Sequence, residues 1–425
     1  MNFRNRLSIV TLKKGKNSTF TTLDMLFTLL ALIMLELERV SHINGRFKDE
    51  ELLAKQLDIK RIFDQSTANR FLRKLNKWHI NQLERALNGI IQDKGKFKEK
   101  GEICVDIDAS DLTVFSHKYE GAKPGRNKKN KGKDSYQISA AYSEHQIVAT
   151  HFESGNVHCS KSVYSIFYKS LKVLERIDLL RVDAGYISIE FLKWLLKQTI
   201  SEDSDVKIKF LVACSGTADG VKKCKEYAEN HPEKWIASKK NGQVIHLMDF
   251  KKVRLFKGYP EGVVRIILVK MNQKVKTCRK NRVRHKNKER IYAIATNLHK
   301  GFGAKKIFKK YHRRQNIELM FKELKNSFNV GKLPTGKMHG NYAYFLICCI
   351  AYNTGHYFKQ EVLPKKYHNK TLKNIRMFFW EVPAFFTHTW EIYFNPSYKY
   401  IRTYRFIVFK LNYLIECLNY CNNST

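Results

Sequence analysis

Two aspartates lie two residues apart inside a β-rich run, Ile103-Cys-Val-Asp106-Ile-Asp108-Ala-Ser110. Side chains two residues apart on a strand point to the same face, so Asp106 and Asp108 share one face of the predicted strand. Burying a carboxylate on a central strand is costly unless the group is paired or binds a cation. We therefore expect a functional role for at least one of them. The alternative is a strand-end residue that is exposed to water.

The segment from Glu102 to Cys214 alternates between β-rich runs and stretches with helical periodicity. The predicted strands are 103–109, 136–142, 147–152, 179–182 and 206–214, and the predicted helices are 160–177 and 186–199. Three strands followed by alternating helix and strand are typical of a layered α/β core.

Residues 215–290 interrupt this rhythm, because they are polar, rich in lysine and contain only scattered β segments such as 263–269. Within them, Lys270 to Arg290 is nearly a pure basic tract. Such a run is often a solvated loop, but inside a folded chain it favours a hairpin that contacts DNA. Regular structure resumes with a strand from Ile291 and a long helix over 304–328.

The first 95 residues are predicted to be helical. Thr21, Thr22 and Asp24 offer N-caps for an apolar helix over 25–34, which is too short to span a bilayer. A second capped helix with a basic face begins at Asp64, after a turn, and is compatible with a helix-turn-helix that enters a DNA groove. The alternative is a surface helix of a small bundle. Apolar, aromatic stretches at 340–358 and 400–420 predict C-terminal helices.

The charge points to a polyanionic partner. The chain has 78 Lys and Arg residues against 39 Asp and Glu, a formal net charge of +39, which opposes compactness unless a polyanion balances it. Nucleic acid is the expected partner. An acidic membrane surface is disfavoured, since the basic residues are spread along the chain and not gathered beside one apolar anchor. Nine cysteines without metal-ligand spacing argue against a zinc ribbon or disulfide scaffold and suit a reducing cytoplasm.

A further aspartate ends a short apolar strand in Leu179-Leu-Arg-Val-Asp183-Ala-Gly-Tyr186. The glycine allows a sharp turn into the next helix. Sites in open α/β sheets usually form at the carboxyl ends of strands, so Asp183 is a candidate site residue. The alternative is that Asp183 is only the N-cap of that helix.

The last candidate acid lies on the long predicted helix. Successive residues of an α-helix are rotated by about 100° around its axis. On this helix, one carboxylate, three cationic residues and a tyrosine fall within an arc of about 80°. These residues are Tyr311, Arg314, Glu318, Lys322 and Lys325. Such a face suits a metal ligand flanked by phosphate contacts, because Arg grips phosphate with two donors and Lys acts as a point charge. The alternative is a solvated face with ion pairs such as Glu318 to Lys322.

The spacing on this helix resembles the signature of a superfamily of bacterial insertion-sequence DDE transposases, which is Tyr, two residues, Arg, three residues, Glu, six residues, Lys (YREK). The four matching positions are Tyr311, Arg314, Glu318 and Lys325. Asp108-Ala-Ser110 resembles the first Asp motif of that superfamily, and Asp183-Ala-Gly-Tyr186 resembles the second. The run from Gly340 to Asn353 resembles its tail helix. The resemblance covers roughly residues 100–355.

The resemblance implies an α/β fold with a ribonuclease-H-like catalytic core and a β-rich insertion between the second Asp and the Glu. We then expect a helical DNA-binding domain at 1–95, the catalytic domain at 96–335 with its insertion at about 215–290, and a C-terminal helical region at 336–425. Relatives stack an extruded base on an aromatic residue of the insertion. The insertion contains one tryptophan, Trp235, for which a core position is the alternative.

The resemblance also implies roles for the site residues. Asp108, Asp183 and Glu318 would be the catalytic metal ligands for two Mg²⁺ ions, for which Mn²⁺ is expected to substitute. Arg314 and Lys325 would hold the DNA backbone, and Tyr311 would touch a phosphate near the transposon end. Lys322, on the same helix face, is a further candidate DNA contact. Asp106 leaves the first acid open between two residues; we prefer Asp108, because it precedes the small Ala-Ser pair.

The predicted function is therefore a DNA transposase, acting in a bacterial cytoplasm in association with the nucleoid. It would nick element ends and join the 3′-OH to target DNA. Its partners would be double-stranded DNA, as terminal inverted repeats and target, and a second copy in a homodimeric synaptic complex, with no membrane partner. The alternatives are an inactive or domesticated DNA-binding protein of the same fold and another ribonuclease-H-like nuclease.

Overall fold

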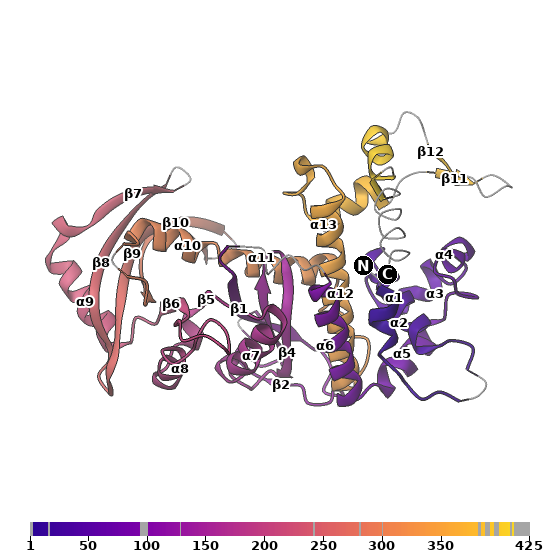
Figure 1. The fold of residues 1–425 in the computed structure, drawn as a ribbon, viewed down its shortest axis with the longest axis horizontal. Coiled ribbons are helices and arrows are strands. Elements are labelled where there is room, and N and C mark those ends of the chain that lie inside the picture. The colour runs from indigo at the N-terminus through magenta and orange to yellow at the C-terminus, as the bar shows by residue number, and fades with distance from the viewer. Residues whose placement is uncertain are drawn as a thin grey trace. The chain divides into compact units, whose positions relative to one another are not determined.

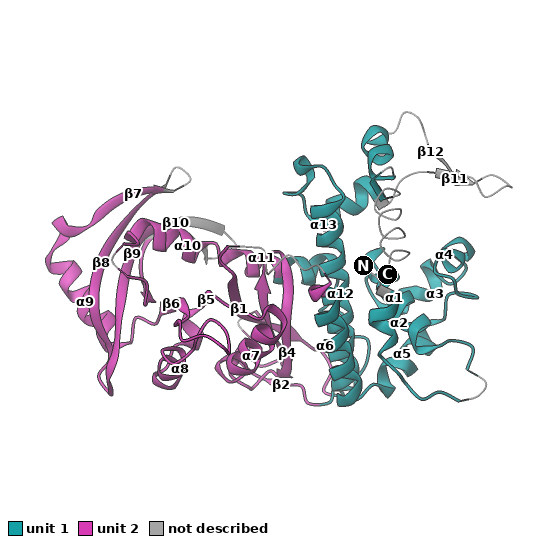
Figure 2. Cartoon of the chain, viewed as in Figure 1, with its two compact units in different colours: residues 1–90, 118–120, 321–425 teal, residues 91–117, 121–320 magenta. Residues whose placement is uncertain are grey.

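The computed structural model describes residues 3–15, 18–93, 101–127, 129–240, 243–279, 282–299, 301–380, 384–386, 392–394, 399–408 and 410–411. Of residues 3, 240, 243, 273–279, 282–288, 380, 384–386 and 392–394 it describes the backbone alone. The chain forms two compact units (Figure 2). The sheet unit comprises Ile91–His117 and Gly121–Met320, and the helical unit comprises Met1–Ile90, Lys118–Glu120 and Phe321–Thr425. The N-terminal and C-terminal helical regions, predicted as separate domains, thus belong to one unit.

The sheet unit is built on a ten-stranded mixed sheet with the order β2-β3-β1-β5-β6-β10-β9-β8-β7, in which β4 also pairs with β3 (Figure 1). The strands are β1 (Cys104–Thr113), β2 (Lys123–Pro124), β3 (Asp134–Ser143), β4 (Gln146–Ser154), β5 (Leu179–Val182), β6 (Lys209–Cys214), β7 (Ile236–Lys240), β8 (Gln243–Phe256), β9 (Tyr259–Arg279) and β10 (Arg282–Thr296). Strand β3 is antiparallel to β1 and β4, while β5 is parallel to β1 and β6. This mixed α/β architecture is consistent with a ribonuclease-H-like core.

The insertion continues the central sheet. The end of β10 pairs with β6, and β9, β8 and β7 follow in order. Residues 215–290 are β-rich as predicted, but they also contain a helix, α9 (Asp219–Asn230), that was not predicted. The basic tract forms part of a long antiparallel hairpin, in which β9 and β10 pair from Arg279 and Arg282 to Arg265 and Thr296. The hairpin is confirmed, and its contact with DNA stays a prediction.

Helices cover the sheet. Helix α7 (Ser162–Leu174) packs on β3 and β4, and α10 (Ala304–His312) packs on β6, β8 and β9. Helix α8 (Ile189–Leu195) begins after Ser188, whose hydroxyl accepts a hydrogen bond from the Phe191 amide at 3.1 Å. It is shorter than the predicted 186–199 helix, because residues 184–186 form a separate 3₁₀ turn.

The long helix predicted over 304–328 is wrong in one respect. It is two helices, α10 and α11 (Gln315–Ser327), separated at Arg313 and Arg314. The amides of Arg314 and Ile317 bond to carbonyls three residues earlier, at 3.0 and 3.1 Å, which is the tighter 3₁₀ pattern. Tyr311 and Glu318 therefore do not lie on one continuous helix.

The helical unit is organised around α12 (Met338–Glu361), whose middle is buried against α2 (Thr22–Met34) and α5 (Gln65–Lys74). The other helices are α1 (Phe3–Ser8), α3 (Ile43–Arg46), α4 (Glu51–Gln56), α6 (Lys77–Gln92) and α13 (Leu372–Ile375), with a π-helical turn (Arg376–Trp380) and a small β11–β12 pair (Ala384–Phe386, Ile392–Phe394). Helix α12 needs Gly340 at its start, because an added Cβ would lie 2.5 Å from the carbonyl oxygen of Leu72.

Two predictions for the N-terminal helices are confirmed. Thr21 caps α2 in a reciprocal box with Asp24, and Asp64 caps α5 through the Thr67 amide at 2.7 Å. The helix-turn-helix is not confirmed, because residues 57–64 separate α4 from α5, more than the roughly 3–4 residues of that motif. None of the helices in the described ranges is long and apolar enough to cross a membrane.

Candidate functional site

Asp106 is held by an arginine of the neighbouring strand. Arg181 donates from Nε to Oδ1 at 2.5 Å and from Nη2 to Oδ2 at 2.8 Å, and both side chains are buried. Arg181 also donates to the carbonyl oxygen of Lys310 at 2.6 Å. Burial raises the pKa of Asp106, and the charge of Arg181 opposes that shift. Both oxygens of Asp106 are therefore engaged within the fold, which supports Asp108 as the first acid of the candidate site.

Asp108 lies on β1, and Asp183 comes directly after the end of the parallel neighbouring strand β5. The register of β1 and β5 pairs Asp106 with Arg181 and Ile107 with Val182, so the next residues along each strand are the two acids. Residues in register on parallel strands share a face. Burial raises the pKa of Asp108, Arg314 opposes this, and the charge of Asp183 adds to it. The two carboxylates are thus close enough to interact.

Asp183 is the N-cap residue of the following 3₁₀ turn through its backbone alone. Its backbone has a capping conformation, but its side chain makes no capping hydrogen bond and the residue is exposed. The capping role that the sequence leaves open belongs to Ser188, at the start of the next helix. Asp183 therefore presents an exposed carboxylate beside Asp108.

Arg314 joins the first acid to the third. Its Nη1 donates to Asp108 Oδ2 at 2.9 Å, and its Nη2 donates to Glu318 Oε1 at 2.5 Å. The side chain of Arg314 is 9% exposed, that of Asp108 is 19% exposed and that of Glu318 is 52% exposed. The position of Arg314 in the turn between α10 and α11 lets its side chain reach both the sheet and the helix. One guanidinium therefore bridges Asp108 and Glu318, and the charge of Asp183 also acts on it.

The other residues of the predicted face have different environments. Tyr311 is largely buried in the apolar layer beneath α10, and burial raises its pKa well above its usual value. Lys322 is exposed and Lys325 is half-buried, one and nearly two turns after Glu318 on α11. The phosphate contact predicted for Tyr311 stays a prediction, and the two lysines are the more accessible candidates.

Tyr186 and Cys159 border the acids and were not identified from the sequence. The Tyr186 hydroxyl is buried without a hydrogen-bond partner among the described groups. Burial raises the pKa of Tyr186, and the charges of Cys159, Asp108 and Asp183 raise it further. The hydroxyl therefore lies beside the carboxylates, where it could bind a further polar group. The Gly-Tyr pair after Asp183 was the available signal.

The donor set fits hard divalent cations, which prefer carboxylate oxygens to imidazole or thiolate. Within the described ranges, no three acidic, imidazole or thiol side chains lie close enough together to hold a metal ion. Around Asp108 and Glu318 the reason is visible, because the Arg314 guanidinium lies between their oxygens. One positive charge thus pairs with both carboxylates.

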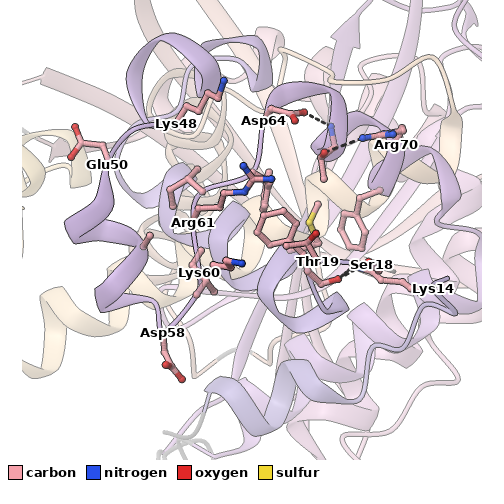
Figure 3. A pocket seen from close by; sticks show the side chains of 18 of the residues that line it. Lys14, Ser18, Thr19, Lys48, Glu50, Asp58, Lys60, Arg61, Asp64 and Arg70 are labelled. Carbon is pink, nitrogen blue, oxygen red and sulfur yellow. Dashed lines mark hydrogen bonds between the residues drawn. The ribbon is translucent and has the colours of Figure 1, made fainter. Parts of the chain in front are cut away.

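The helical unit has a large basic pocket of about 1250 Å³ between α4, α5 and residues 12–20. Seven cationic residues line it: Lys14, Lys48, Lys55, Lys60, Arg61, Arg70 and Lys74. Figure 3 shows Arg61, from the segment before α5, and Arg70, from α5, among the side chains that line this pocket. Five acidic residues also line the pocket, so its basic character is partly balanced. Its volume and charge suit a segment of polyanion better than a small apolar ligand.

The family model of the transposase DDE domain matches residues 99–354, more than half of the 425-residue chain. The chain belongs to this family. Members of the DDE transposase family are typically enzymes of DNA transposition and generally use divalent metal ions. The match includes Asp108, Asp183 and Glu318 within its limits.

Other comparisons add little to the family assignment. Curated proteins give no match. Among solved structures, the chain is similar to the Mos1 transposase paired-end complex with left transposon end, at 13% identity and a TM-score of 0.16. That match covers 44% of this chain and 60% of the other, less than two thirds of its length. A similarity this weak carries no argument about the site.

Proposed function

We propose that this DDE-family protein is an active transposase of the YREK superfamily of bacterial insertion sequences. It would nick the ends of its element and join the 3′-OH to target DNA, with Asp108, Asp183 and Glu318 as the catalytic acids. The observation that carries the proposal is the convergence of these acids on Arg314. Two of them contact the guanidinium directly, and the third comes directly after β5, the strand that pairs with β1 up to Ile107.

The reaction requires an activated oxygen nucleophile and a stabilised leaving oxygen. When bound, two Mg²⁺ ions, or Mn²⁺ in their place, supply both. Asp108 and Asp183 would provide ligands from the rigid sheet, and Glu318 would provide one from α11. The buried pair of Asp106 and Arg181 fixes the register that sets Asp108 beside Asp183. The chain's own contribution would thus be to bring oxygen ligands from β1, from the residue after β5 and from α11 to the same reacting phosphate.

Three features support double-stranded DNA as the partner. Lys322 and Lys325 follow Glu318 along α11, where they would hold backbone phosphates next to the reacting one. The hairpin of β9 and β10 contains the basic tract 270–290. The pocket beside the capped helix α5 gathers cations in the predicted DNA-binding region 1–95 (Figure 3). We assign end recognition to that region.

Synapsis would require two copies of the chain, each with one transposon end. The Mos1 structure is described as a paired-end complex with a transposon end, and we extend pairing of ends to this chain as part of the proposal. The target would also be double-stranded DNA. The location in a bacterial cytoplasm, with the nucleoid, belongs to the same proposal.

The test is Mg²⁺-dependent cleavage of a supercoiled plasmid that contains the inverted repeats flanking the gene. We expect nicked and strand-transfer products from the unmodified protein, and neither product from Asp108→Asn, Asp183→Asn or Glu318→Gln. The matched control is Glu190→Gln, since this carboxylate is fully exposed on α8. DNA binding by the three variants should persist in a gel-shift assay.

The same experiment separates the alternatives. An unmodified protein that binds the ends but never nicks them, with Mg²⁺ or Mn²⁺, is an inactive or domesticated DNA-binding protein. Nicking without strand transfer indicates another nuclease of this fold. Cleavage at the unmodified rate by Glu318→Gln would remove Glu318 from the catalytic acids.

A further inference from the structure

Arg314 forms two ion pairs inside the candidate site. Its guanidinium donates to Asp108 of β1 at 2.9 Å and to Glu318 of α11 at 2.5 Å, with separate Nη atoms. Burial lowers the pKa of Arg314, but Tyr311 and the charges of Asp108, Asp183 and Glu318 outweigh it and raise that pKa. A guanidinium at this position cannot be neutralised. One fixed positive charge therefore lies among the three acids.

This charge occupies the space that an ion shared by Asp108 and Glu318 would need. A divalent ion binds carboxylate oxygens at about 2.0–2.6 Å, whereas a guanidinium holds them at hydrogen-bond distance. A second cation inserted beside the first would meet strong repulsion in this partly buried place.

We propose that Arg314 is an internal counter-cation, which fills the position between Asp108 and Glu318 until DNA arrives and must leave before a divalent ion binds there. The inference rests on the proposed function, because it takes these acids as metal ligands. It gives Arg314 a role before any phosphate contact, namely to keep the acids paired in the free protein.

The location of Arg314 makes such a movement feasible. The residue lies in the short turn between α10 and α11, and not in the middle of a helix. A DNA phosphate offers the guanidinium a bidentate partner that replaces the two carboxylates. Since DNA would remove a competitor of the metal, DNA and metal should each strengthen the binding of the other. The resting protein would then load its metal ions chiefly when bound to DNA.

The first test measures Mn²⁺ binding to the full-length protein without DNA by isothermal titration calorimetry. Arg314→Gln should bind Mn²⁺ at least about tenfold more tightly than the unmodified protein, because the competing charge is gone. Arg313→Gln is the matched control. It removes the same charge from the preceding residue, which is exposed. This variant should bind Mn²⁺ as tightly as the unmodified protein does. Arg314→Lys keeps the charge, so its Mn²⁺ affinity should be closer to that of the unmodified protein than the affinity of Arg314→Gln is.

Thermal unfolding gives a second readout. Arg314→Gln leaves two carboxylates without their partner, so its melting temperature should fall without metal and rise more steeply with Mn²⁺ than that of Arg313→Gln. Equal or weaker Mn²⁺ binding by folded Arg314→Gln would overturn the inference. That outcome leaves the proposed function intact if Asp108→Asn still abolishes Mn²⁺ binding and cleavage.

A third measurement needs no variant. The Mn²⁺ affinity of the unmodified protein should increase about tenfold or more when a duplex of the transposon end is present. The Mn²⁺ must be titrated against a blank containing the duplex alone. An affinity that does not change with DNA would contradict the inference even if Arg314→Gln fails to fold.

Discussion

Arg181 binds both carboxylate oxygens of Asp106 across two parallel strands, at 2.5 and 2.8 Å, and the two residues are direct partners in the strand register. Asp106 and Asp108 therefore have different surroundings although they share a strand face. The first is fixed by a neighbour on β5, and the second faces Arg314 at the candidate site. Of these two acids, Asp106 has a structural role and Asp108 is the candidate catalytic residue.

Removal of one member of the Asp106–Arg181 pair should be strongly destabilising. Arg181→Met leaves a buried carboxylate uncompensated, and Asp106→Asn leaves a buried guanidinium with a weaker partner. Each should lower the free energy of unfolding of the sheet unit by about 3–5 kcal/mol. Urea denaturation measures the loss, followed by the fluorescence of Trp194 and Trp235 of that unit after the three tryptophans of the helical unit have been replaced by Phe.

The double variant Asp106→Leu/Arg181→Met is the control for this pair, because it removes both charges together. It should be more stable than either single variant. Losses that simply add in the double variant, or single losses below about 1 kcal/mol, would show that the pair does not hold the two strands.

The strands of the core could be predicted because each is a short β-rich run bounded by turn residues. The strand Leu179–Val182 has the predicted bounds. Its four residues are buried, and the Asp-Ala-Gly turn that follows marks its end. The capping of α2 by Thr21 was equally local. Information of this kind lies within a few residues of sequence, and the structure confirms it.

Contacts between distant segments could not be predicted in this way. The partner of Asp106 lies 75 residues away and that of Asp108 lies 206 residues away, so neither spacing appears in a local pattern. The helical wheel also assumed one helix through Arg314. The backbone there has the 3₁₀ pattern, and the guanidinium of Arg314 points to the acids. A helical wheel drawn for an ideal α-helix cannot show this direction. Sequence motifs identify the three acids, but only the fold shows how they are arranged.

Glu323 should make the helical unit sensitive to acid. Its Oε2 lies 2.9 Å from His356 Nε2 and its Oε1 accepts from the Leu372 amide at 2.6 Å. Burial raises the pKa of Glu323, but the hydrogen bond and charge of His356 outweigh it, so the pKa lies below its usual 4.5. A depressed pKa means stability that is present above about pH 4.5 and is lost as the pH falls through the folded-state value.

Glu323→Gln should therefore lower the free energy of unfolding at pH 7 by about 1–3 kcal/mol. The difference from the unmodified protein should shrink as the pH falls below 4.5, because the carboxylate is protonated first in the unfolded state and then, at its lower pKa, in the folded state. Denaturation between pH 3 and pH 7 measures it. Glu229→Gln, an exposed residue of α9, is the control. A difference that stays constant with pH would exclude the ionised Glu323 as its source.

Lys322 and Lys325 should contribute to DNA affinity as phosphate contacts. Each substitution by alanine should weaken binding and lower the slope of log affinity against log salt by about one unit. Fluorescence anisotropy with a labelled duplex at several salt concentrations gives the slope. Lys322→Arg preserves the charge and should keep the original slope. An unchanged slope for either alanine variant would exclude that lysine from contact with the backbone.

Arg376 should be essential to the helical unit, because it binds the carboxyl ends of two helices. It is 1% exposed and donates to the carbonyl oxygens of Met34, Ile33 and Ser327, at 2.6, 3.1 and 2.6 Å. These carbonyls end α2 and α11, where a positive charge also interacts favourably with the helix dipoles. The residue joins segments that are more than 300 positions apart in the sequence.

Arg376→Met fills much of the same volume but leaves the three carbonyls without this donor. We expect the free energy of unfolding of the helical unit to fall by at least about 3 kcal/mol, since bonds to a charged donor contribute about 1.5–3 kcal/mol each. Arg405→Met, an exposed arginine in the same unit, should change it by less than about 0.5 kcal/mol. Equal stability of the two variants would mean that water or other donors replace Arg376 at these helix ends.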